Sequence, residues 1–187
     1  EGRTTGLPDP FFMIATESPV ESEGTFPLPE VQKDRFFLSL SIGYPELSDE
    51  RELMKSRKTK ADPVSEMKTV TEPEEVKKMQ EAVFGIHVSE PLRAYILQLV
   101  RVTREDDRLM IGVSPRGSLA LYKGSQALAA IRGRDYVTPE DVQDIMVSVL
   151  RKRILLKSEQ SSRGLTEDEV IEDIKTKATV PPMQDAV

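Results

Sequence analysis

The feature that most constrains the fold is a helical segment built largely from small residues. It starts at Ser114-Pro115, where serine can cap a helix and proline fits the first helical position. The small residues that follow are Gly117, Ala120, Gly124, Ala127 and Ala130. Because small side chains let neighbouring helices approach closely, this segment is predicted to be the buried centre of a helical bundle.

Two long helices are predicted to pack around this centre. Ser89 can cap the first, which places Leu92, Tyr95, Ile96, Leu99 and Val100 on one face at helical spacing. The second starts at Thr138-Pro139 with acids in its first turn, and an apolar stripe runs from 142 to 150. Shorter helices are predicted near 29–34, 49–57 and 74–84 and after Thr166, so the fold class is mainly α.

The first 45 residues have a different sequence pattern from the rest of the chain. The run 11–15 is short, apolar and bounded by turn formers, and the run 36–42 alternates serine with apolar residues. Both are predicted to be strands, joined by a loop rich in Gly, Pro, Ser and Glu. Residues 1–45 are therefore expected to be a piece of an α/β sheet rather than a complete domain.

Composition removes several classes of site. The chain has no cysteine and one histidine, His87, which excludes disulfides, thiolate metal sites and sites that need two imidazoles. The net charge of −6 gives no general reason to expect nucleic-acid binding. No apolar run approaches a membrane span and no signal peptide opens the chain, so a cytoplasmic protein is the expectation. His87 is expected to be a structural or surface residue rather than a catalytic base, and the cluster 151–153 to be a solvated helix face.

The segment 11–19 resembles the strand of AAA+ ATPases that ends in the sensor-one residue. That residue is polar and lies beside the γ-phosphate of ATP, where it helps to orient the attacking water. The corresponding residue here is Ser18, whereas MoxR relatives usually have asparagine. Serine has a shorter reach and a single hydroxyl, so this departure bears on how efficiently ATP would be hydrolysed.

The segment 23–36 is similar to the MoxR stretch that links sensor one to the next strand. In that family an arginine finger lies in the Asp-Arg-Phe element, which makes Arg35 the candidate. A finger must reach the γ-phosphate of a neighbouring subunit and stabilise the charge that develops during transfer. Without the resemblance, Arg35 would be read as a surface arginine paired with Asp34 or Glu30.

The segment 111–121 resembles the sensor-two element of the AAA+ lid, and the residues give an independent argument. The start at Ser114-Pro115 puts Arg116 in the first helical turn, where a cation opposes the helix dipole. This suggests an anionic ligand nearby, because Arg116 and the N–H groups of the turn would together face a phosphate. The alternative is an arginine paired with a carboxylate. The segment 134–142 matches the next element of the lid.

The resemblance to MoxR-type AAA+ ATPases implies a division of the chain into three parts. Residues 1–45 would be the C-terminal piece of the α/β nucleotide-binding core, 46–157 the helical lid, and 158–187 a linker, a short helix and a tail. The first residues, which include no initiating methionine, suggest a fragment.

The same resemblance implies a ring, expected to be a hexamer, that binds ATP and Mg²⁺ at its subunit interfaces. Family members act like chaperones in maturing or assembling protein complexes, often with partners that carry a von Willebrand factor A domain. The sequence contains no Gly-x-x-x-x-Gly-Lys-Ser/Thr loop, so the chain alone is predicted neither to bind nor to hydrolyse ATP. Two alternatives stay open: a non-catalytic helical interaction domain, or the lid of an AAA+ ATPase that remodels nucleic acid.

Overall fold

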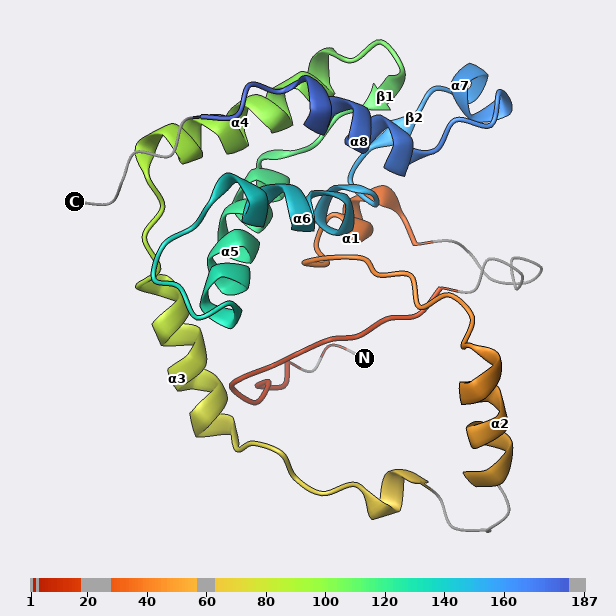
Figure 1. The fold of residues 1–187 in the computed structure, drawn as a ribbon, viewed down its shortest axis with the longest axis vertical. Coiled ribbons are helices and arrows are strands. Elements are labelled where there is room, and N and C mark those ends of the chain that lie inside the picture. The colour runs from red at the N-terminus through yellow and green to blue at the C-terminus, as the bar shows by residue number, and fades with distance from the viewer. Residues whose placement is uncertain (1, 3, 18–27, 57–62, 182–187) are drawn as a thin grey trace.

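A computed structural model describes residues 2, 4–17, 28–56 and 63–181, and their arrangement is mainly helical (Figure 1). The helices are α1 (Glu30–Lys33), α2 (Leu47–Ser56), α3 (Pro73–Phe84), α4 (Glu90–Glu105), α5 (Pro115–Ile131), α6 (Pro139–Leu150), α7 (Ser158–Ser162) and α8 (Glu167–Lys177). A 3₁₀ turn covers Pro63–Glu66, and the two strands are β1 (Leu109–Ile111) and β2 (Leu155–Leu156). The predicted mainly α class is confirmed. None of the described helices has the length and apolarity that a membrane span requires.

The buried core is built mainly by the helices α4, α5, α6 and α8, with α5 at its centre. Helix α5 packs against α3, α4 and α6, and α8 packs against α4 and α6. The antiparallel pair of β1 and β2, in which Leu109 faces Leu156, ties the connection before α5 to the connection after α6. A single bridge between His87 and Tyr136 joins the start of α4 to the start of α6. His87 therefore serves the fold through its backbone, as expected.

The small residues of α5 explain why it can occupy the centre. A Cβ added to Gly124 would lie 2.7 Å from Cδ1 of Ile145 on α6, and one added to Gly117 would lie 2.2 Å from Cγ1 of Val113. Both distances are shorter than any carbon–carbon contact that packing allows. The prediction that α5 is the buried centre of the bundle is confirmed, because α6 could not approach a bulkier helix this closely.

The start of α6 is fixed by a buried carboxylate. Asp141 and Thr138 form a reciprocal capping box, in which the Thr138 backbone N–H donates to Asp141 at 2.8 Å. Arg134 donates to both oxygens of this carboxylate at 2.6 and 2.8 Å, and Arg132 adds a third bond at 2.8 Å. The fully buried charge of Asp141 is therefore matched by two guanidinium groups and a backbone donor.

The segments 11–15 and 36–42, predicted to be strands, form neither helix nor strand in the structure. The physical reason is that a strand needs a neighbouring strand to form its ladder of hydrogen bonds, and the described residues offer these segments no such strand. Their large apolar side chains, among them Phe12, Ile14, Leu40 and Ile42, are exposed. The second segment is attached to the bundle by the Ser39 N–H, which donates to the Ser148 carbonyl of α6 at 2.7 Å, and by the carbonyls of Phe36 and Phe37, which accept from Arg153.

Candidate functional site

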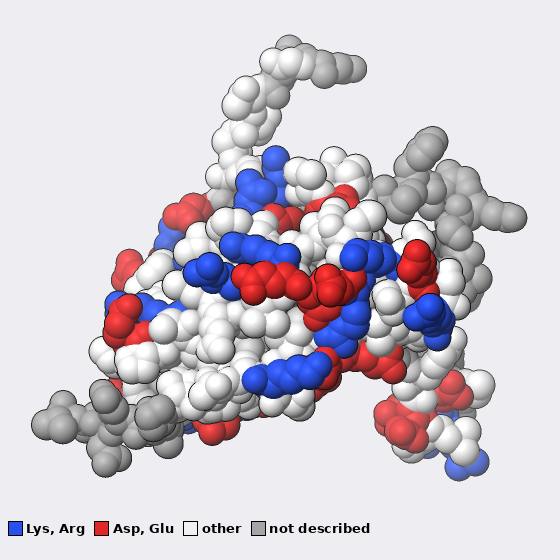
Figure 2. Space-filling view, turned by 90° about the horizontal axis from the view of Figure 1, so that it is seen from above, with Lys and Arg blue, Asp and Glu red and all other residues white. Residues whose placement is uncertain are grey.

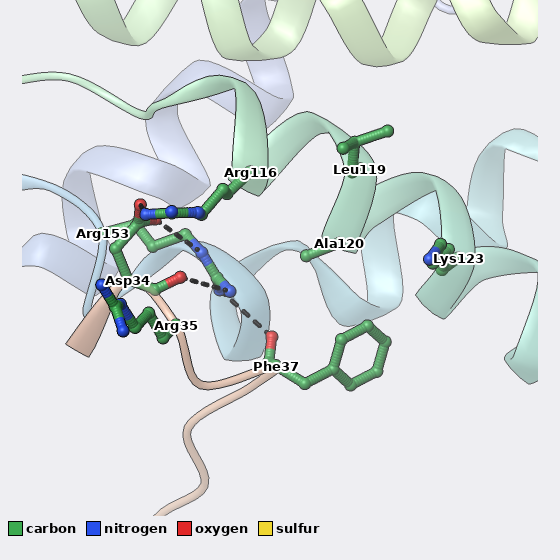
Figure 3. A pocket seen from close by; sticks show the side chains of 8 residues that line it. All are labelled: Asp34, Arg35, Phe37, Arg116, Leu119, Ala120, Lys123 and Arg153. Atoms are coloured by element: carbon green, nitrogen blue, oxygen red, sulfur yellow. Dashed lines mark hydrogen bonds and ion pairs between the residues drawn. The ribbon is translucent and has the colours of Figure 1, made fainter. Parts of the chain in front are cut away.

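A pocket of about 250 Å³ lies where the chain after α1 meets the first turns of α5 (Figure 3). Four of its lining residues are cations and one is an acid. The lining consists of Asp34, Arg35, Phe37, Arg116, Leu119, Ala120, Lys123 and Arg153. The pocket therefore brings together Arg35 and Arg116, the two arginines that the sequence singled out.

Asp34 is the residue around which this pocket is organised. Its carboxylate accepts hydrogen bonds from the Ser114 hydroxyl at 2.9 and 3.1 Å. The carboxylate also lies 3.3 Å from Nε of Arg153 and 3.6 Å from Nη1 of Arg116. Ser114 in turn accepts a hydrogen bond from the Arg116 backbone N–H at 3.2 Å, so one hydroxyl both caps α5 and holds Asp34.

The anion predicted near Arg116 is, in this structure, the carboxylate of Asp34. The pairing with a carboxylate that the sequence left as an alternative is thus present. However, 3.6 Å is a loose contact, and 58% of the Arg116 side chain remains exposed to solvent. Most of the donors on this guanidinium therefore stay accessible to a ligand entering the pocket.

Arg153 corrects the prediction that 151–153 is a solvated helix face. Its side chain is only 4% exposed and extends from the end of α6 underneath the chain that follows α1. It donates to the carbonyls of Phe37 at 3.1 Å, of Phe36, and of Val149 near the end of α6. Burial lowers the pKa of the Arg153 guanidinium, and the Asp34 carboxylate opposes that shift. The sequence signal for this role is spacing, since position 153 continues the buried stripe of α6.

A glycine of α5 makes room for this buried arginine. A Cβ at position 117 would lie 3.2 Å from Cδ of Arg153 and 3.5 Å from Cδ2 of Leu150. Gly117 is itself buried in the first turns of the helix, directly above the aliphatic part of Arg153. The same small residue that lets the helices approach also admits Arg153 to the pocket.

Arg35 lies on the exposed side of the pocket, between residues that are held in place. Its side chain makes no ion pair with any described residue, so the surface pairing with Asp34 or Glu30 is not formed. Glu30 instead pairs with Lys33 at 3.1 Å. In the view of Figure 3, Arg35 and Arg116 lie on opposite sides of Asp34. Ser18, the third predicted site residue, lies outside the described residues.

Comparison with known proteins places both sides of the pocket in one family. The description "AAA lid domain" matches residues 101–174, and "ATPase family associated with various cellular activities (AAA)" matches residues 1–38. The "Chaperone MoxR1" of Mycobacterium tuberculosis is 33% identical over 96% of this chain. The chain belongs to the MoxR family of AAA+ ATPases.

Two further proteins match nearly the whole chain. The "Uncharacterized protein YeaC" of Bacillus subtilis is 37% identical over all 187 residues. A solved structure from Cytophaga hutchinsonii, named as a candidate ATPase, superposes on 97% of the chain with a TM-score of 0.84 and 31% identity. The chain spans 58% of YeaC, 49% of MoxR1 and 58% of the solved chain. The chain thus spans about half the length of the relatives that it matches.

The two matched regions meet at the pocket. Asp34 and Arg35 belong to the part that matches the AAA description, whereas Arg116 and Arg153 belong to the part that matches the lid. The contacts of Asp34 with Ser114 and Arg153 are therefore contacts between the two regions of a MoxR protein.

Proposed function

We propose that the intact protein is an ATP-hydrolysing AAA+ ring and that this chain supplies two arginines, Arg35 and Arg116, to one bound nucleotide. The observation that carries the proposal is that both arginines line a single pocket beside the start of α5. Arg35 is the proposed arginine finger and Arg116 the proposed sensor. Both roles are taken from the resemblance to the family, and the position of Arg35 and Arg116 in one pocket supports them.

The electrostatics of the pocket favour a polyphosphate over other small anions. Arg35 and Lys123 make no ion pair with any described residue, and Arg116 is held only loosely by Asp34. Three cations are therefore available on one rim, while Asp34 is already engaged by Ser114 and Arg153. Guanidinium groups bind phosphate oxygens through paired hydrogen bonds, and the charge of a triphosphate matches several such groups.

The shared pocket also suggests how subunits would cooperate. An arginine finger acts on the nucleotide of a neighbouring subunit. Since Arg116 opens into the same pocket as Arg35, we infer that it senses that neighbour's nucleotide rather than one bound to its own chain. Each subunit would present both arginines to the next one around the ring.

The lining does not suit Mg²⁺, which prefers oxygen ligands, because Asp34 is the one carboxylate among the residues that line the pocket. We therefore propose that this chain contributes charge stabilisation and sensing, while ATP and Mg²⁺ are held by the neighbouring subunit. Ser18 would orient the attacking water, as its place in the sensor-one motif implies.

The process that ATP hydrolysis would drive is proposed from what the relatives are named to do. MoxR1 is named a chaperone, and we extend to this protein a chaperone-like role in maturing or assembling protein complexes in the cytoplasm. From the resemblance to the family, we expect partners that carry a von Willebrand factor A domain. The face of the molecule in Figure 2 carries acidic and basic side chains side by side. Such mixing favours a protein client over the phosphate backbone of nucleic acid.

The test is a set of arginine variants in the full-length protein. Arg35→Ala should reduce ATP turnover by about 10³-fold or more while sparing nucleotide affinity, because a finger acts on the transition state. Arg93→Ala is the matched control, since Arg93 is an exposed arginine of α4 whose partner among the described residues is Glu90 of the same helix. Turnover of Arg35→Ala at the level of the Arg93→Ala control would refute the assignment.

A further inference from the structure

We infer that Arg153 is a positioning residue for the arginine finger: it clamps the backbone on both sides of Arg35 to the lid of the same chain. The inference rests on the proposed function of Arg35, but the clamp is a geometric feature that can be tested without ATP. It assigns a role to a residue that the family motifs in this sequence do not include.

The clamp is made by one guanidinium that contacts several consecutive residues. Before Arg35, Nε of Arg153 lies 3.3 Å from the Asp34 carboxylate, and Nη2 lies 3.5 Å from the Asp34 carbonyl. After Arg35, the same guanidinium donates to the carbonyls of Phe36 and Phe37. The residues flanking the finger are thus fixed, while the Arg35 side chain is left exposed.

The clamp is anchored at its other end in the rigid part of the bundle. Arg153 donates to the Val149 carbonyl of α6, and its aliphatic part packs against Gly117 at the start of α5. Val149 and the neighbouring Leu150 are buried in the core. The Arg35 backbone is therefore held at a fixed position relative to α5 and α6, the two helices that pack most extensively against each other.

The chemistry of this contact requires arginine. A guanidinium is planar and offers five N–H donors in a fixed fork, which can reach separate carbonyls and a carboxylate at the same time. Lysine has one ammonium at the end of a flexible stem and cannot span these acceptors. A displacement of about 1 Å at a catalytic group can lower the rate about 10²-fold, so loss of the clamp should be visible in turnover.

A contact that only stabilised the fold would act differently. It would protect the whole bundle and would be largely restored by any side chain that filled the same space. A positioning contact protects the segment 34–39 selectively, and its loss lowers the catalytic rate while leaving the affinity for nucleotide unchanged. These two signatures decide between the roles.

The first measurement is hydrogen–deuterium exchange of the full-length protein without nucleotide. In Arg153→Met and Arg153→Lys we expect peptides covering 34–39 to exchange at least tenfold faster, with peptides from α4 unchanged. The exposed Arg93→Met, in which the same chemical change is made away from the pocket, should leave both regions unchanged. If Arg153→Met exchanges faster in all peptides because the whole bundle is destabilised, the comparison is made with Arg153→Lys, which keeps the positive charge.

The second measurement is steady-state turnover with nucleotide affinity determined separately. Both Arg153 variants should lose at least tenfold in kcat with a change in nucleotide Kd of less than twofold. Wild-type exchange of 34–39 in both variants, or full turnover in Arg153→Lys, would overturn the inference. Failure of the proposed function would give a different result, because Arg35→Ala would then keep its ATP turnover. The hydrogen–deuterium exchange of the Arg153 variants would still test the clamp in that case.

Discussion

The Ser114 hydroxyl donates to both oxygens of the Asp34 carboxylate, at 3.1 and 2.9 Å, across 80 positions of the sequence. This contact joins the start of the central helix to the residue immediately before the proposed finger. It also places a carboxylate against Arg116, at the helix end where an anion is favoured by the dipole. Asp34 thus holds the anion position beside α5 that the sequence led us to expect for a ligand.

Removing this carboxylate should destabilise the chain. Asp34→Ala would leave the buried guanidinium of Arg153 without its counter-charge, and we expect a loss of about 2–4 kcal/mol in the free energy of unfolding. Urea denaturation of the 187-residue chain measures it. Glu52→Ala, which removes an exposed partner of Lys55 on α2, should cost less than about 1 kcal/mol. Equal losses in the two variants would show that the Asp34 contacts contribute little.

Gly117→Ala should be destabilising even though alanine is the better helix former. The added Cβ would lie 2.2 Å from Val113 and 3.2 Å from Arg153, and overpacking of this kind costs about 1–3 kcal/mol. Gly6→Ala is the control, because a Cβ there meets no atom within 4 Å. Thermal unfolding of both variants tests the prediction, which fails if Gly117→Ala unfolds at or above the wild-type temperature.

The stability of the chain should fall in acid, partly through Asp141. Burial opposes ionisation of Asp141, but hydrogen bonds from Arg134, the Thr138 backbone and Arg132 lower the pKa of its carboxyl below the ordinary value of 3.8. As the pH falls, the unfolded chain therefore takes up this proton before the folded chain does. The stabilisation is complete above about pH 5 and is lost as the pH falls through 3.8 towards the lowered pKa of the folded state.

Asp141→Asn supplies the comparison for this pH dependence. Unfolding free energies measured between pH 7 and pH 3 should show the variant well below wild type at pH 7, with the two curves converging towards pH 3. Part of the acid slope should remain in the variant, because the hydrogen bond from Arg108 lowers the pKa of Asp106 in the same way. Parallel curves would show that Asp141 titrates alike in the folded and unfolded states.

The 187-residue chain on its own should not bind ATP appreciably. Its sequence has no phosphate-binding loop, and the arginines of the pocket are proposed to act on a nucleotide held by a neighbouring subunit. Titration calorimetry with Mg-ATP should give no heat of binding at micromolar concentrations. A micromolar dissociation constant would mean that the pocket binds nucleotide unaided.

The helices could be predicted from the sequence because their signals are local. Ser114-Pro115 and Thr138-Pro139 start α5 and α6 as expected, and the small residues of α5 correctly indicate its central place. The segments 11–15 and 36–42 have the composition of strands. Composition does not supply a neighbouring strand, however, and none pairs with these segments among the described residues.

The pocket was predictable only in part, for a related reason. Arg35 and Arg116 stand out by motif and by position on a helix, whereas Arg153 stands in a run of three basic residues that is typical of a solvated surface. What buries Arg153 is a carboxylate and a set of carbonyls more than 100 positions earlier in the chain. The spacing of the buried stripe of α6 can indicate that position 153 is buried, but no local pattern encodes its distant partners.

The length of that separation has a consequence for the order in which the protein folds. The bonds from Arg153 to the carbonyls of Phe37, Phe36 and Asp34 close loops of 116, 117 and 119 residues, whereas the capping boxes form within one turn. Large loops are closed late, after the intervening helices have reduced the entropy lost on closure. The backbone around Arg35 would therefore reach its native place only on a bundle that is already assembled, so a chain with a misfolded lid would not position the proposed finger.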